Sequence, residues 1–232
     1  MIMNDSYLKM CAWGGPIFCA LFLIGFIGFA DFMPPISPAD SAQQVADIYK
    51  TDATSIKIGL IFMMIGLSFT MPFVSAIITR MKQMQNSSPT LVTTFVIVSA
   101  ALSCFLFVLV CSWAVASFRA DRAPEIIQAF NDFAWILLIW PVSLIPVSYI
   151  ALGLAVLADN KQQPIFPRWY AFLNFWFAVL AYGGCLLIFF HEGPFAWDGL
   201  IAFWIPAVAF FGWYIVTSIV LLQSKDPIAE LN

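Results

Sequence analysis

Charged residues are scarce in this sequence, and their scarcity excludes an ordinary soluble fold. Only 10% of the 232 residues are charged, whereas soluble domains carry roughly 25%. The charges gather in short clusters between long apolar runs, and the mean hydropathy is +0.91. Because a water-soluble chain has no way to bury so many apolar side chains, the composition indicates an integral membrane protein.

Basic patches and paired cysteines are also lacking. The net charge is -3 and no basic patch exists beyond Arg80 and Lys82, so the sequence predicts no nucleic-acid partner. None of the cysteines has CxxC spacing, and all lie in or beside apolar runs. We therefore expect buried free thiols rather than disulfides or a zinc site at Cys11, Cys19, Cys104, Cys111 and Cys185.

Histidine occurs once, at position 191. A haem held by two histidines therefore cannot be built within one chain. Ligation by His191 and a methionine, or a site shared between copies, stays conceivable without positive support. The HExxH, GxSxG, Walker A and GxGxxG signatures are absent as well, so the sequence identifies no cofactor.

Six apolar segments are long enough to cross a bilayer, which takes about 20 residues. We predict an all-α bundle of about six transmembrane helices, forming a single domain over residues 1–232. The first segment is too long for a signal-peptide core and is expected to be a retained span. The predicted spans are 12–32, 58–79, 91–118, 133–157, 169–190 and 199–222.

No Lys, Arg, Asp, Glu or His lies in the interior of these six segments. Proton-coupled carriers and pumps usually keep ionisable residues near the middle of the membrane, where such residues are costly and functional. Their absence argues against ion-coupled transport of a charged substrate. It favours a neutral or apolar ligand instead.

The loop charges predict the orientation of the bundle. An even number of spans places both termini on one side, and that side holds six Lys and Arg residues against four on the other. The positive-inside rule then predicts that both termini are cytoplasmic. Short loops and the lack of a targeting signal suit a bacterial inner membrane.

Two outer loops show helical patterns, and we expect each to form a short amphipathic helix. After the first span, Ser37 and Pro38 suit an N-cap and a first helical position. After the third span, Pro124 begins a stretch whose apolar residues recur at helical spacing. The two apolar stripes are Ala42, Val45, Ala46 and Tyr49 in one loop, and Ile126, Ile127, Phe130 and Phe133 in the other.

Prolines and glycines within the spans predict kinks and close packing. A proline removes a helix hydrogen bond and tends to kink the helix, which can open a cavity. The span prolines are Pro16, Pro72, Pro141, Pro146 and Pro206. Glycines let helices approach closely in lipid, and those in the first and fifth spans include Gly14, Gly15, Gly25, Gly28 and Gly183.

Aromatic residues make up 17% of the chain, and several lie deep in the predicted spans. A deep tryptophan can face lipid or a neighbouring helix, or it can line a pocket for a flat apolar molecule. The polar groups Tyr149 and Asn174 can tie helices together or orient a small ligand. The predicted pocket residues are Trp140, Trp204, Trp213, Tyr149 and Asn174.

The outer ends of spans one, five and six carry four ionisable residues, Asp31, His191, Glu192 and Asp198. If these spans are neighbours, a histidine with two or three carboxylates could bind a metal or exchange protons. The alternative is that polar residues simply mark helix ends where water begins. His191 and Glu192 are the candidate catalytic residues of this cluster.

Three functions fit the sequence. The first is a small membrane protein, surrounded by lipids, that binds or passes an apolar or neutral molecule. The second is an accessory subunit of a larger membrane complex or homo-oligomer. The third is a membrane enzyme that uses the cluster around His191. Of these functions, the two without catalysis fit the sequence better than the enzyme does.

Overall fold

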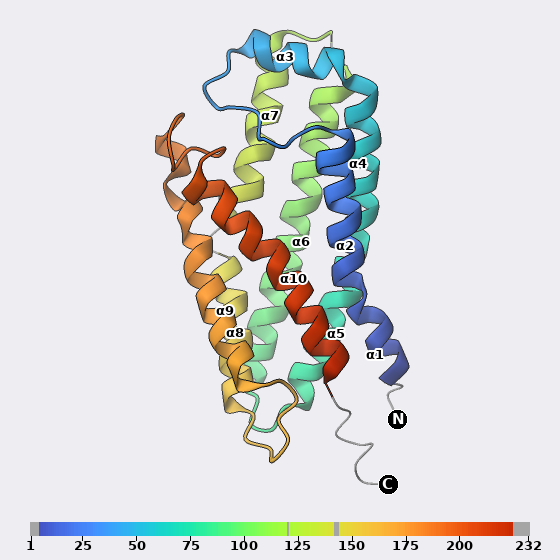
Figure 1. Cartoon of the computed structure of the whole chain (residues 1–232), viewed down its shortest axis with the longest axis vertical. Helices are drawn as coiled ribbons and strands as arrows, with labels where there is room; N and C mark the ends of the chain where they lie inside the picture. The colour runs from blue at the N-terminus through green and yellow to red at the C-terminus, as the bar shows by residue number, and fades with distance from the viewer. Residues whose placement is uncertain (1–4, 120, 142–143, 225–232) are drawn as a thin grey trace.

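The computed structural model describes residues 5–119, 121–141 and 144–224, and this part of the chain contains helices and no strands. Five apolar helices are long enough to cross a membrane: Ser6–Phe29, Ala53–Gln83, Pro89–Phe118, Arg168–Phe189 and Leu200–Gln223. The prediction of an all-helical membrane protein is therefore confirmed. Most of these helices run along the long axis of the molecule, and α10 (Ile205–Gln223) crosses the bundle obliquely (Figure 1).

Several of the long helices consist of consecutive segments of different helix type. A π-helix, η1, continues α2, and another, η4, precedes α10, while the 3-10 helix η3 continues α9. The segments are α1 Asp5–Ala12, α2 Gly14–Leu23, η1 Ile24–Phe29, α3 Ala42–Thr51, α4 Ala53–Ser68, α5 Thr70–Gln83, α6 Pro89–Phe118, α7 Pro124–Ile139, α8 Ile145–Ala158, α9 Arg168–Ala181, η3 Tyr182–Phe189, η4 Leu200–Trp204 and α10 Ile205–Gln223.

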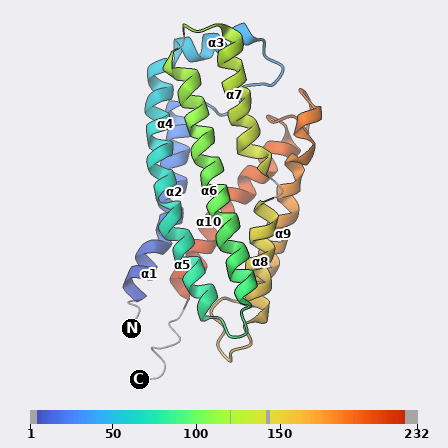
Figure 2. The ribbon, with the colours of Figure 1, turned by 180° about the vertical axis from the view of Figure 1, so that it is seen from behind.

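The predicted span 133–157 is two helices, α7 and α8, with a break between them. Pro141 lacks the N–H group that would donate the next hydrogen bond of the helix, so α7 ends before it. Pro146 then lies in the first turn of α8, where proline is tolerated. Residues 142–143 lie outside the described part of the chain. Figure 2 shows α7 in the upper part of the bundle and α8 in the lower part.

The second predicted loop helix is not a separate element. The stretch that begins at Pro124 continues without interruption to Ile139 as α7. Of the predicted apolar stripe, Ile126 and Phe133 are exposed and Ile127 is buried, together with Asn131 and Trp135. Apolar side chains face the lipid in a membrane bundle, so hydrophobicity alone does not locate its core.

The first predicted loop helix is present as α3, but it begins at Ser41 rather than at Ser37. The Ser41 side chain accepts a hydrogen bond from the Gln44 backbone N–H, and the Gln44 side chain accepts one from Ser41 N–H at 2.8 Å. This reciprocal pair forms a capping box. Val45 and Tyr49 are buried, and α3 lies across the upper end of the bundle (Figure 1).

The long helices form a closed ring in which each contacts the next along the chain. The segment α2–η1 packs on α4, α4 on α6, and α6 on both α7 and α8. Helix α9 packs on α8 and α10, and α10 returns to α2. The first residues of α1 and the last of α10 lie at the same end of the bundle (Figure 1).

Buried polar residues tie the loops at this lower end. Arg80, near the end of α5, has a buried side chain. Its Nε atom donates a hydrogen bond to the Ser224 hydroxyl at 2.9 Å. The buried Asp159 carboxylate accepts hydrogen bonds from the backbone N–H groups of Gln85 and Ile165. These bonds connect three segments at this end of the bundle, so the ends of α5, α8 and α10 are held together.

Glycine permits the closest helix contact, as the sequence predicts. Gly25 of η1 lies against Gly59 of α4, and a Cβ atom on either would overlap the other's carbonyl oxygen. A Cβ on Gly183 would likewise overlap the Ile201 carbonyl oxygen, which explains how η3 and η4 approach each other. Gly28 differs, because a Cβ there meets no atom within 4 Å.

This contact predicts that Gly25→Val destabilises the protein and that Gly28→Val does not. The added side chain at position 25 has to push α4 away, which we expect to lower the free energy of unfolding by about 2 kcal/mol or more. Thermal unfolding of both variants in the same detergent measures the difference. Equal melting temperatures for the two variants would contradict the close approach of η1 and α4.

Candidate ligand-binding cavity

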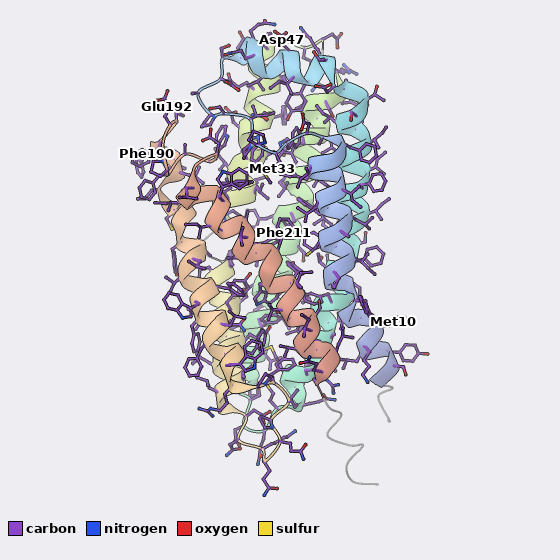
Figure 3. All side chains as sticks on the ribbon, in the orientation of Figure 1. Met10, Met33, Asp47, Phe190, Glu192 and Phe211 are labelled. Carbon is purple, nitrogen blue, oxygen red and sulfur yellow. The ribbon has the colours of Figure 1, made fainter. Side chains whose placement is uncertain are left out.

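A cavity of about 130 Å³ lies inside the ring of helices. Its lining comes from α2, η1, α5, α6, α7, α8, α9, η4 and α10, together with Met33 and Pro141. Figure 3 labels two of the lining residues, Met33 from the loop after η1 and Phe211 from α10. The cavity therefore lies next to the break between α7 and α8.

The wall of the cavity is mainly aromatic and aliphatic. Phe22, Phe26, Phe177, Phe203 and Trp213 contribute rings to it, and no charged side chain is among its described lining residues. Burying an ionised ligand without an opposite charge is costly. The wall is thus suited to a neutral molecule. Engineered apolar cavities of about 150 Å³ bind benzene, so this space suits a compact ring.

Hydroxyl groups supply the few polar atoms of the wall. The Ser103 hydroxyl donates to the Ser99 carbonyl at 2.9 Å, and the Ser148 hydroxyl donates to the Ile145 carbonyl at 2.8 Å. Each serine oxygen retains lone pairs that can accept a further hydrogen bond. Tyr149 is 5% exposed, and its hydroxyl makes no hydrogen bond within the described part of the chain.

A buried hydrogen-bonded chain behind the wall holds Trp213 in place. The Trp213 indole N–H donates to Asn174 Oδ1 at 2.9 Å, and Asn174 Nδ2 donates to the Tyr170 carbonyl at 2.8 Å. The Tyr170 and Thr217 hydroxyls are 2.7 Å apart. Since the indole N–H is already paired, Trp213 presents only its apolar ring to the cavity.

The structure brings together some of the predicted pocket residues. Trp213 and Tyr149 line the cavity with their ring centroids 4.9 Å apart. Asn174 does not line it but holds Trp213. Trp140 and Trp204 lie elsewhere, at 45% and 37% exposure, and their indole N–H groups donate to the carbonyls of Cys185 and Asp198.

The spacing of Trp204 and Trp213 in the sequence predicts that the two side chains lie on opposite faces of the helix. At about 100° per residue, nine positions place two side chains on opposite faces of a helix. Only one of the pair can then face the interior. The cavity-lining residues Pro206, Ala209 and Trp213 follow each other at intervals of three and four on α10.

The predicted outer cluster does not form a metal site in the described part of the chain. Asp31, His191 and Glu192 are exposed, and Asp198 is half-buried. No group of three or more His, Cys, Asp or Glu side chains among the described residues is placed to hold a metal ion. Glu192 lies on the loop at the outer edge of the bundle (Figure 3).

A polar cluster that was not predicted from the sequence lies beneath α3. Buried Asn131 accepts hydrogen bonds at its side-chain oxygen from the Tyr49 hydroxyl at 3.0 Å and from the Trp135 indole N–H at 3.2 Å. Its own amide donates to Asp132 at 3.2 Å. Asn131 precedes Trp135 by four residues, a spacing that places both on one helical face.

Burial governs the acid–base behaviour of Tyr49, which belongs to α3 and lies outside the membrane-spanning helices. Its pKa is raised well above the usual value by complete burial and then by the Asp132 charge.

Comparisons with protein-family models, with curated proteins and with solved structures find no match. The function is therefore argued from the cavity and its surroundings.

The hydrogen bond to Trp213 predicts that Asn174→Leu destabilises the protein by about 1–3 kcal/mol, because it leaves a buried indole N–H unpaired. The double variant Asn174→Leu, Trp213→Phe has no such group, and we expect it to regain part of the loss. Chemical unfolding in detergent gives both free energies. An Asn174→Leu variant as stable as the wild type would contradict the role of this bond.

The Tyr49 environment predicts a pH-dependent effect of Tyr49→Phe. At neutral pH the variant loses one hydrogen bond, worth about 1 kcal/mol. Because the folded-state pKa is raised, the tyrosine's contribution is fully present below the pKa of free tyrosine, about 10, and falls as the pH rises above it. The stability difference between wild type and variant should therefore shrink in alkaline solution. A difference that stays constant there would contradict the buried, neutral state of Tyr49.

Proposed function

We propose that this protein binds or passes a neutral, mainly apolar small molecule through the cavity inside its helical ring. The observation that carries the proposal is the cavity itself, with its aromatic wall and lack of charged lining residues among those described. Ligand sites in membrane bundles form between helices where a helix is interrupted. The break between α7 and α8 beside the cavity supports the same reading.

We propose further that α7 and α8 together make a sixth crossing of the membrane. Both lie along the bundle, one above the other (Figure 2). The placement of the first residues of α1 and the last of α10 at one end requires an even number of crossings. A sixth crossing over residues 133–157 meets that requirement. Interrupted helices are tolerated in a membrane where the free backbone groups lie against protein or line a cavity.

The proposed setting is a bacterial inner membrane, with the end that carries Arg80 and Lys161 on the cytoplasmic side. Arg80 lies in the last turn of α5, and Lys161 donates to the Gln83 carbonyl at 2.7 Å. The greater number of Lys and Arg residues at this end supports the orientation. In this setting α3 covers the outer end of the ring.

The enzyme hypothesis has less support from the site. His191 and Glu192 lie exposed on a loop, away from the apolar cavity. Water surrounds them there, and no described residue is placed with them to form a metal site. The toluene-binding experiment below distinguishes the accessory-subunit hypothesis from the ligand-binding hypothesis.

The proposal predicts that toluene binds to the purified protein and that filling the cavity prevents binding. Ala209 lines the cavity, whereas its neighbour Val208 is 73% exposed. We expect Ala209→Phe to weaken toluene binding by about tenfold or more, since it occupies the ligand's space. Val208→Phe, which adds the same ring on the outer surface, should bind like the wild type.

Calorimetric titration in detergent, corrected with protein-free micelles, measures these affinities. Binding to the wild type and to Val208→Phe, but not to Ala209→Phe, supports the cavity as the site. Equal heats for all three proteins would mean that toluene only dissolves in the micelles. That result would contradict the proposal and direct attention to partner subunits.

A further inference from the structure

The cavity has one polar side, at the start of α8. This helix begins about halfway along the bundle rather than at its surface (Figure 2). Three residues of its first turns, Ile145, Ser148 and Tyr149, line the cavity. The N-terminal end of a helix carries a partial positive charge, which favours a negatively polarised group nearby. In a dry interior this charge is screened far less than in water.

The Tyr149 hydroxyl is a second and independent feature of this side. Its ring is fixed between Trp213 and Phe177, with centroids at 4.9 Å and 6.2 Å. The residue is 5% exposed, and its hydroxyl makes no hydrogen bond among the described residues. A buried tyrosine hydroxyl usually finds a partner. In this wall the neighbouring Ser148 hydroxyl already donates to a backbone carbonyl.

We propose that the ligand carries a neutral hydrogen-bond acceptor, such as a carbonyl or nitrile group, which the Tyr149 hydroxyl binds. This inference rests on the proposed function, because it names the chemistry of the molecule in the same cavity. The ligand's apolar part then lies against the rings of Trp213, Phe177 and Phe203. A carboxylate is disfavoured, since no described lining residue is a Lys, Arg or His.

Tyr149 suits this role better than Tyr214, the other tyrosine of the wall. The Tyr214 ring packs against Phe18 of α2 at 4.7 Å and Phe73 of α5 at 5.1 Å. It belongs to α10, in the interior of a continuous helix. Tyr149 belongs to α8 itself, one turn after its start.

The test compares benzonitrile with phenylacetylene, which have nearly the same shape but differ in their ability to accept a hydrogen bond. We expect the wild type to bind benzonitrile about threefold to tenfold more tightly, after correction for micelle partitioning. Tyr149→Phe should bind both compounds with the affinity that the wild type has for phenylacetylene. Tyr182→Phe, which changes an exposed tyrosine outside the cavity, should keep the preference.

The infrared band of the nitrile gives a readout that a purely structural role of Tyr149 does not move. In the wild type and in Tyr182→Phe, the bound nitrile should show the frequency of a hydrogen-bonded group. In Tyr149→Phe it should show the frequency found in an apolar solvent. This shift reports the contact itself, independently of any loss of stability in the variant.

The possible failures are distinguishable. Equal binding of both compounds to the wild type would overturn the acceptor chemistry while leaving the cavity as an apolar site. A preference that survives Tyr149→Phe but disappears in Tyr214→Phe would overturn the assignment to Tyr149. If neither compound binds above the micelle background, the proposed function itself fails.

Discussion

Pro141 prevents a continuous helix from joining α7 to α8, and the cavity lies beside the interruption. In hydrocarbon, every interrupted helix has to lie against protein, because lipid cannot pair with free backbone groups. Residues on both sides of the interruption, Ile139, Pro141 and Ile145, line the cavity, together with residues of the neighbouring helices. The break, the ring and the cavity are therefore parts of one arrangement.

The absence of charge in the spans and the composition of the wall lead to the same ligand class. The polar groups near the cavity are neutral, and the Trp213 indole is held by Asn174 rather than by a ligand. Arg80 and Asp159, by contrast, are buried at the lower end of the bundle and hold loops there. These charged groups stabilise the lower end of the bundle, whereas the described residues that line the cavity are neutral.

Hydropathy predicted the positions of most spans and the glycine contacts, because apolar length and small residues determine both. It did not predict which face of each helix is inside, since lipid accepts the same side chains as the core. That is why the predicted apolar stripe of α7 contains buried Ile127 beside exposed Ile126 and Phe133, and why Trp204 was grouped with Trp213. The unpaired Tyr149 hydroxyl depends on contacts distant in sequence, so only the structure identifies it.

The most direct test is native mass spectrometry of the protein purified in mild detergent, without added ligand. The account predicts that the wild type and Val208→Phe retain a neutral apolar molecule of the same mass. Ala209→Phe, whose new side chain fills the cavity, should lack it. An identical bound mass in Ala209→Phe, or no bound molecule in any of the three, would contradict the cavity as the functional site.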